Sequence, residues 1–161
     1  MNAILHKFQL HFFVIIVFLF ASCQQIDIFE KNTAIPNHAW QSNFSCNGTF
    51  EINDTTSLYN IYVVLRHTDA YKYNNIWLNI GLQSLGDTMY FQKTNLSLGD
   101  DAKGWYGAGM DDIWEVRKML TERPKAFRKK GVYHFSVKHN MRDEPLKNIM
   151  SAGLRVEKVK S

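Results

Sequence analysis

The stretch IWLNIGLQS, residues 76–84, decides the fold class. Every second residue from Ile76 to Leu82 is a large aliphatic residue, whereas Trp77, Asn79 and Gln83 fall between them. Successive side chains of a β-strand point to opposite faces, so this period of two predicts a half-buried strand. The turn LGD at 85–87 leads directly into TMYFQKTNLSL, residues 88–98. We expect these two segments to form a hairpin.

The same period of two recurs on both sides of this hairpin. It is found in FSCNGTFEI (44–52), LYNIYVVLRH (58–67), GVYHFSVKHN (131–140) and GLRVEKV (153–159). LYNIYVVLRH is apolar on both faces, which is typical of a central strand. In FSCNGTFEI, the pair Asn47-Gly48 predicts a bulge or turn. We therefore expect an all-β protein, an antiparallel, jelly-roll-like β-sandwich of about seven or eight strands.

The segment DDIWEVRKMLTE, residues 111–122, is ambiguous. Two aspartates at its start and basic residues near its end favour one short helix. Its alternation through Trp114, Val116 and Leu120 favours a strand. Both alternatives stay open from the sequence.

The N-terminus is typical of a secretory signal peptide. An apolar run from Phe12 to Ala21 follows Lys7, and it is about half the length that a membrane span requires. Small residues directly before Cys23 are what a lipoprotein signal peptidase requires, although Phe20 departs from the usual pattern. We expect residues 1–22 to be removed and Cys23 to carry acyl chains such as palmitate, with an ordinary signal peptide as the alternative.

The mature chain is long enough for one domain with its own core. We expect residues 23–41 to be the lipidated N-terminus and a tether, with room for one edge strand, and residues 42–161 to form the β-sandwich. Removal of Lys7 leaves 18 basic and 15 acidic residues, a net charge of +3. Basic residues gather in RPKAFRKKG, residues 123–131. An exported chain seldom meets nucleic acid, so we interpret this cluster as a solvated loop and expect no nucleic-acid partner.

No motif of a known catalytic or metal site occurs in the chain. His134 and His139 are five residues apart and would point to opposite faces of one strand, so they cannot chelate one ion together. The pairs Asp100-Asp101 and Asp111-Asp112 lack the alternating spacing of a calcium loop and are expected to cap turns. We expect no cofactor and no enzymatic activity; a hydrolase that uses scattered carboxylates is the least favoured alternative.

Cys46, Trp77 and Trp105 are the remaining candidate site residues. Cys46 falls on an apolar strand face and is expected to be a small buried hydrophobe. Trp77 falls on the polar face of its strand, so an exposed sugar-stacking platform is conceivable with Trp105. A carbohydrate-binding envelope lipoprotein is therefore the alternative function, although aromatic residues more often fill a core and its rims.

The order of several segments resembles a known family. The most telling pieces are Leu65, Arg66, Tyr71, Tyr73 and Asn75; Gly131, Tyr133, Phe135, His139, Met141 and Arg142; and the terminal G-x-R-x-E-K from Gly153. Together with the SCQQ at 22–25 and GWYGAGMDDI at 104–113, they make the chain similar to the gliding motility-associated lipoprotein GldH family.

The resemblance implies a cell-envelope lipoprotein that takes part in gliding and is linked to secretion of motility adhesins. It implies partners among envelope, motility or secretion proteins, with the membrane reached through Cys23. It implies no catalytic residue. Few acidic residues follow Cys23, which argues against surface export, so we expect the domain to face the periplasm.

Overall fold

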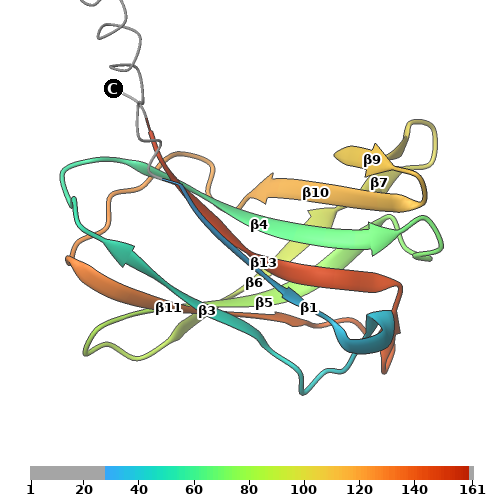
Figure 1. Cartoon of the computed structure of the whole chain (residues 1–161), viewed down its shortest axis with the longest axis horizontal. Helices are drawn as coiled ribbons and strands as arrows, with labels where there is room; N and C mark the ends of the chain where they lie inside the picture. Colours follow the sequence, from blue (N-terminus) through green and yellow to red (C-terminus); the bar gives the residue numbers. More distant parts are fainter. Residues whose placement is uncertain (1–27, 160–161) are drawn as a thin grey trace, which may run out of the picture.

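Two antiparallel sheets pack face to face in the computed structural model, which describes residues 28–159 (Figure 1). The five-stranded sheet has the order β1 (Ile28–Ala34), β13 (Ile149–Lys158), β4 (Tyr59–Thr68), β10 (Ile113–Met119) and β9 (Ala108–Met110). The four-stranded sheet has the order β3 (Cys46–Ile52), β11 (Gly131–His139), β5 (Asn75–Ser84) and β6 (Tyr90–Ser97). The expected all-β antiparallel sandwich is confirmed, with nine strands in its two main sheets.

Four shorter strands and a single turn of 3₁₀ helix complete the described chain. β2 (Ala39–Trp40) pairs with β12 (Leu146–Lys147), β7 (Gly99–Asp100) pairs with β8 (Gly104–Trp105), and the 3₁₀ turn η1 spans Pro36–His38. The alternative of a short helix at 111–122 is wrong. Trp114 pairs with His67 and Val116 with Leu65, so the cross-strand partners on β4 outweigh the helical propensity of the segment.

The hairpin at 76–98 is confirmed, since β5 and β6 pair from Asn75 with Ser97 to Leu82 with Tyr90. The predicted turn or bulge at Asn47-Gly48 is wrong. Both residues lie inside β3, where Gly48 pairs with Phe135. A β-carbon at position 48 would collide with the Phe135 ring, so the glycine makes room for a large aromatic side chain and not for a turn.

The N-terminal part of the described chain belongs to the sandwich. The edge strand that the sequence allowed is β1, which pairs with β13 along its whole length, from Ile28 with Glu157 to Ala34 with Ser151. Trp40 is fully buried and pairs with Leu146. Residues 28–41, which the sequence assigned to the tether, therefore include two strands of the fold, β1 and β2. Cys23 and residues 1–22 lie outside the described residues.

The core lies between the two sheets, and both sheets contribute to it. Its largest fully buried side chains include Trp40, Leu65, Ile76, Leu78, Phe135 and Leu154. The alternation predicted for the last strand is confirmed, because Leu154 and Val156 are buried whereas Arg155 and Glu157 are partly exposed.

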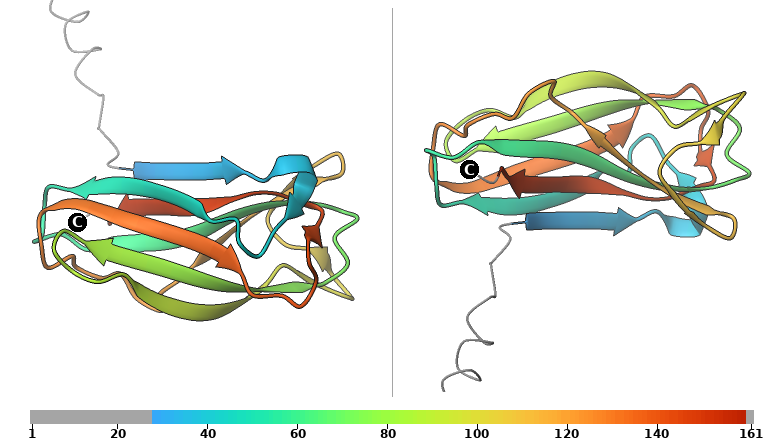
Figure 2. Two further views of the ribbon diagram at one scale, coloured as in Figure 1. Left: turned by 90° about the horizontal axis from the view of Figure 1, so that it is seen from below. Right: turned by 90° about the horizontal axis from the view of Figure 1, so that it is seen from above.

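Different loops and strand termini lie at the two ends of the sandwich (Figures 1 and 2). The basal end is where β1 begins and β13 ends, and it also carries the loops 53–58, 84–89 and 120–130. The far end carries η1 and the loops 69–74, 98–112 and 140–148. This arrangement places segments distant in sequence on one surface.

Candidate functional site

The chain has two cysteines, Cys23 and Cys46, and the structure describes the second. Cys46 on β3 is fully buried and free, and burial raises the pKa of its thiol to about 12. The prediction that it is a small buried hydrophobe is confirmed. Cys23, the predicted lipid-attachment residue, lies outside the described residues, and Cys46 as placed in the core is unsuited to pair with it.

Tyrosines of the first family block hold the loop 69–74 at the far end. Tyr71 is buried and donates a hydrogen bond to the carbonyl of Asn75 at 3.1 Å. Tyr73 donates to Asp143 at 3.0 Å, and Lys72 makes an ion pair with the same carboxylate at 2.6 Å. The hydrogen bonds from Lys72 and Tyr73 keep the pKa of Asp143 below its usual value. These residues tie the loop 69–74 to the loop 140–148.

Residues of the second family block, 131–142, also lie at the far end, near the loops 69–74 and 140–148. His139 is buried at the end of β11 and packs against the Trp40 ring, with 5.4 Å between ring centroids. The backbone amide of Trp77 donates to the sulfur of Met141 at 3.2 Å. The two blocks, about 70 residues apart in sequence, therefore meet in space, and most of their side chains serve packing and loop closure.

A network of six charged side chains, here called the charge ladder, crosses four strands on the outer face of the five-stranded sheet. Its contacts are Arg66 to Glu115 at 2.7 Å, Arg117 to Glu115 at 2.8 Å, Arg117 to Glu30 at 3.7 Å, Arg155 to Glu30 at 2.9 Å and Arg155 to Glu157 at 3.3 Å. Partial burial raises the pKa of Glu30, but hydrogen bonds from Arg155 and Asn32 and the charge of Arg117 outweigh it and leave that pKa lowered. A connected network can contribute to stability where an isolated surface pair contributes little.

The terminal block G-x-R-x-E-K has a structural explanation in this ladder. Arg155 and Glu157 are two of its members, and Lys158 pairs with Asp54 at 2.8 Å. A β-carbon on Gly153 would collide with the Lys31 carbonyl oxygen of β1 and approach the Asn32 side-chain oxygen to 2.5 Å. The glycine therefore allows β1 to lie close against β13.

The acidic pairs are turn residues, as the sequence predicts. Asp100 accepts hydrogen bonds from the amides of Ala102 at 2.8 Å and Lys103 at 3.2 Å. Among residues 28–159, no group of three or more His, Cys, Asp or Glu side chains is placed to hold a metal ion.

Tryptophans do not form a shared platform. Trp77 is 39 % exposed, as its place on the polar face predicts, but Lys93 lies over its ring with 5.1 Å between Nζ and the centroid. Trp105 is half-buried with its ring 4.6 Å from that of His67, and Trp40 is fully buried. A sugar that stacked on this face would meet one tryptophan, whose ring already has a lysine across it.

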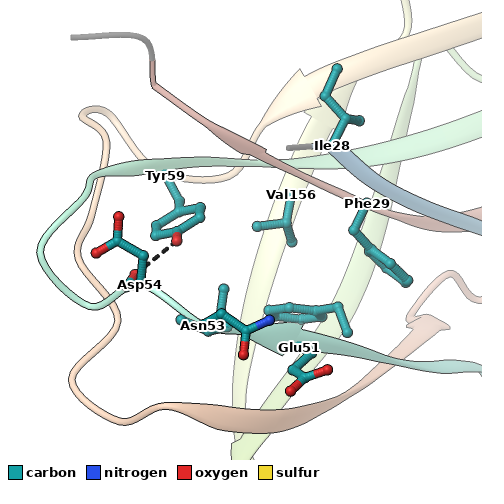
Figure 3. A pocket seen from close by; sticks show the side chains of 9 residues that line it. Ile28, Phe29, Glu51, Asn53, Asp54, Tyr59 and Val156 are labelled. Carbon is teal, nitrogen blue, oxygen red and sulfur yellow. Dashed lines mark hydrogen bonds between the residues drawn. The ribbon is translucent and has the colours of Figure 1, made fainter. Parts of the chain in front are cut away.

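A small cavity of about 150 Å³ opens at the basal end, between β1, β3 and the end of β13 (Figure 3). Its wall includes Ile28, Phe29 and Val156, and its rim carries Asp54, whose carbonyl accepts a hydrogen bond from Tyr59 at 2.7 Å. Hydrogen bonds from Lys158, Ser57 and Thr56 hold the pKa of Asp54 well below its usual range. The carboxylate closes the loop 53–58 and is not poised as a proton donor.

A second hollow, here called the β6 slot, lies between the sheets beside edge strand β6. It has a volume of about 210 Å³ and a mainly aliphatic wall, with Tyr90, Gln92 and Thr94 of β6 at its side and Thr121 and Lys125 also lining it; the aliphatic residues are Ile61, Ile80, Leu82, Leu120 and Leu154. In the described part of the chain, β6 pairs with β5 alone. Its residues 90–93 are all exposed, including Tyr90 at 74 % and Phe91 at 49 %. Sequence patterns revealed the hairpin but did not reveal this open edge.

Over residues 28–159 there is no helix long and apolar enough to cross a membrane.

The chain is similar to two curated gliding motility lipoproteins. It is 25% identical over 163 residues to the gliding motility lipoprotein GldH homolog of Christiangramia forsetii, and the match covers 94% of this chain and 96% of that protein. It is 24% identical over 146 residues to the gliding motility lipoprotein GldH of Flavobacterium johnsoniae, which covers 86% of this chain and 89% of that protein.

Solved structures give only distant likenesses. The insecticidal delta-endotoxin Cry8Ea1 of Bacillus thuringiensis matches with a TM-score of 0.42 and 11% identity over 81% of this chain and 20% of its own. The VP2 subviral particle of infectious bursal disease virus matches with a TM-score of 0.31 and 11% identity over 84% of this chain and 33% of its own. The family model of the GldH lipoprotein, by contrast, matches residues 27–156, nearly the whole described domain. The chain therefore belongs to the GldH lipoprotein family.

Proposed function

We propose that this protein is a membrane-anchored lipoprotein of the cell envelope that supports gliding motility and the associated secretion by docking to another envelope protein. Acyl chains on Cys23 attach it, and the sandwich faces the periplasm. Family membership supports the anchor, and so does the position of Cys46, whose burial leaves Cys23 as the cysteine available for modification. Buried acyl chains contribute about 0.8 kcal/mol per methylene, so several chains hold a domain stably at a membrane.

The state of the carboxylates supports a non-enzymatic role. A general acid that works near neutral pH needs a raised pKa. Among residues 28–159, every carboxyl group with a shifted pKa is shifted downward; these groups are Glu30, Asp54, Asp87, Asp143 and Glu144. Each is engaged by a cation, a hydroxyl or a backbone amide and closes a turn or joins two strands.

The observation that carries the docking proposal is the open edge of β6 beside an aliphatic slot. A partner strand that pairs with β6 would gain backbone hydrogen bonds and would direct alternate side chains between the sheets. The slot is smaller than the range of about 300–1,000 Å³ that is typical of small-molecule sites, so aliphatic side chains of a protein suit it better.

The test is an affinity pull-down from gently solubilised envelopes, with co-purifying proteins identified by mass spectrometry. Gln92→Lys places a charge at the slot, whereas Asn95→Lys places the same charge on the outer face of the same strand. We expect motility or secretion proteins with wild type and Asn95→Lys, and their loss with Gln92→Lys. Cys23→Ala should lose both acylation and these partners.

Equal recovery of partners with Gln92→Lys and Asn95→Lys would show that β6 is not the docking edge. If no protein is recovered and wild type instead retains glycan, the carbohydrate-binding alternative replaces the docking role. An unchanged mass of the Cys23 peptide would contradict lipid attachment.

A further inference from the structure

The basal end combines three features that the sequence scatters along the chain. The chain between Cys23 and the first described residue, Ile28, spans at most about 18 Å when fully extended. A lipid on Cys23 would therefore keep this end of the sandwich at the membrane surface (Figure 1). This step rests on the proposed function, whereas the two features below do not.

Positive charge is concentrated at the basal end. Its three loops carry five basic residues, Arg123, Lys125, Arg128, Lys129 and Lys130, against the three acidic residues Asp54, Asp87 and Glu122. Two of the acidic residues are already paired, Asp54 with Lys158 at 2.8 Å and Asp87 with Lys129 at 2.7 Å. The other four basic side chains are exposed, and within residues 28–159 no ion pair joins them to a carboxylate.

The far end has the opposite charge. Its loops carry four basic residues, Lys72, Lys103, Arg142 and Lys147, against seven acidic ones, Asp69, Asp100, Asp101, Asp111, Asp112, Asp143 and Glu144. The domain therefore has a charge asymmetry along its long axis, with the positive end where the chain leads toward Cys23.

Exposed apolar side chains gather at the same end as the positive charge. Leu85 at the tip of the β5–β6 turn is 74 % exposed, Leu58 before β4 is 47 % exposed, and Val132 and Ile28 at the starts of β11 and β1 are 42 % and 36 % exposed. Exposed apolar side chains that gather on one surface with polar residues around them mark interaction or membrane sites, whereas a single exposed leucine does not. Aliphatic side chains flanked by lysine and arginine are the composition that binds the boundary between headgroups and acyl chains of anionic membranes.

We infer that the basal end is a membrane-contact surface that binds anionic phospholipid headgroups through the loop 120–130 and inserts Leu85 at their boundary. The lipid on Cys23 supplies attachment, and this surface fixes the orientation. The sandwich then stands with its far end away from the bilayer and the edge of β6 open to the side.

The test uses the full chain, processed in cells and reconstituted in nanodiscs of phosphatidylcholine with and without phosphatidylglycerol. Leu85→Cys and Met110→Cys each receive an environment-sensitive fluorophore; the two native side chains are 74 % and 73 % exposed but lie at opposite ends. Cys46 is buried and an acylated Cys23 has no free thiol, so wild type should take up no label.

We expect the Leu85→Cys probe to shift to the blue on nanodiscs that contain phosphatidylglycerol, and the Met110→Cys probe to stay unchanged. Neutralising Arg123, Lys125, Arg128 and Lys130 to Gln should weaken this contact by up to about 600-fold, since each such charge contributes roughly fivefold near an anionic surface. Neutralising Lys103, Arg142 and Lys147 to Gln at the far end is the matched control and should have no effect.

Equal signals from the two probes, or a Leu85→Cys signal independent of phosphatidylglycerol, would overturn the inference. If wild type takes up label, Cys23 is not acylated and the anchoring proposal fails. In that case the two probes are repeated in a Cys23→Ala background, where only position 85 or 110 takes up label. A phosphatidylglycerol-dependent shift at Leu85→Cys there would still support the contact surface, so the two failures are distinguishable.

Discussion

Replacement of Gly153 by alanine should weaken the attachment of β1, the strand that leads toward Cys23. Gly153 pairs with Asn32, and an added β-carbon would meet the Lys31 carbonyl oxygen on β1. Because that contact is with backbone, the strain is relieved only if the strands move apart. Overpacking of this kind costs about 1–3 kcal/mol of unfolding free energy.

That cost converts to a measurable change in melting temperature. For a domain of this size, 1 kcal/mol corresponds to about 3–5 °C, so Gly153→Ala should lower Tm by roughly 3–15 °C. Ser151→Ala is the matched control. Ser151 lies two residues earlier on β13 and pairs with Ala34 of β1, and this substitution also introduces an alanine. It should change the free energy of unfolding by about 0.5 kcal/mol or less.

The strand that moves can be identified by hydrogen exchange. β1 is an edge strand held by β13 alone in its sheet, so exchange should rise over Ile28–Ala34 more than over β4. A Gly153→Ala chain with the melting temperature and exchange pattern of Ser151→Ala would refute the assignment of Gly153 as the residue that permits close approach.

Three further predictions concern buried side chains. Phe135→Ala should lower the free energy of unfolding by about 3–5 kcal/mol in urea titrations, because Phe135 is 1 % exposed in the centre of the core; a loss below 1 kcal/mol would contradict that placement. Cys46 should resist alkylation at neutral pH until the chain unfolds, since its pKa is raised to about 12 and its side chain is buried; labelling of the native protein would contradict this. Burial lowers the pKa values of His67 and His139 below the ordinary 6.5, so the unfolded state binds more protons than the folded state. The free energy of unfolding should therefore be highest above about pH 6.5 and should fall as the pH decreases below that value. Urea midpoints that are unchanged between pH 7.5 and 5 would disprove this.

Local periodicity was sufficient to predict the strands whose side chains alternate between the core and the outer face. β5 and β11 alternate in this way, and so does β13 from Leu154 onward, because one face of each lies in the core. The segment around Trp114 could not be assigned from its own letters, since its propensity is helical and only the pairing with His67 and Leu65 makes it a strand. The turn or bulge predicted at Asn47-Gly48 was wrong for a similar reason. The residue that requires a glycine there is Phe135, whose ring packs against Gly48 and which lies 87 positions away in the chain.

The candidate sites were less accessible from sequence than the fold. The buried position of Cys46 follows from its strand face, and the exposure of Trp77 follows from the same alternation. By contrast, the charge ladder joins β1, β4, β10 and β13, and no spacing along the chain indicates that Glu30 meets Arg155. The sequence alone predicts that the basic loop 120–130 is a solvated surface. Only the strand order shows that this loop lies at the same end of the sandwich as the start of β1.

Orientation connects the two proposals about this molecule. Both β1 and β6 run along the long axis between the basal and far ends (Figures 1 and 2). If the basal end rests on lipid, the open edge of β6 points away from the membrane. A partner strand that paired with β6 would then run alongside it, away from the bilayer. β1, held by Gly153 packing and the Arg155 to Glu30 ion pair, then connects the lipid to the sheet opposite β6. The charge ladder joins β1 to β13, β4 and β10, so the terminal family block helps to hold in the sheet the strand that leads toward Cys23.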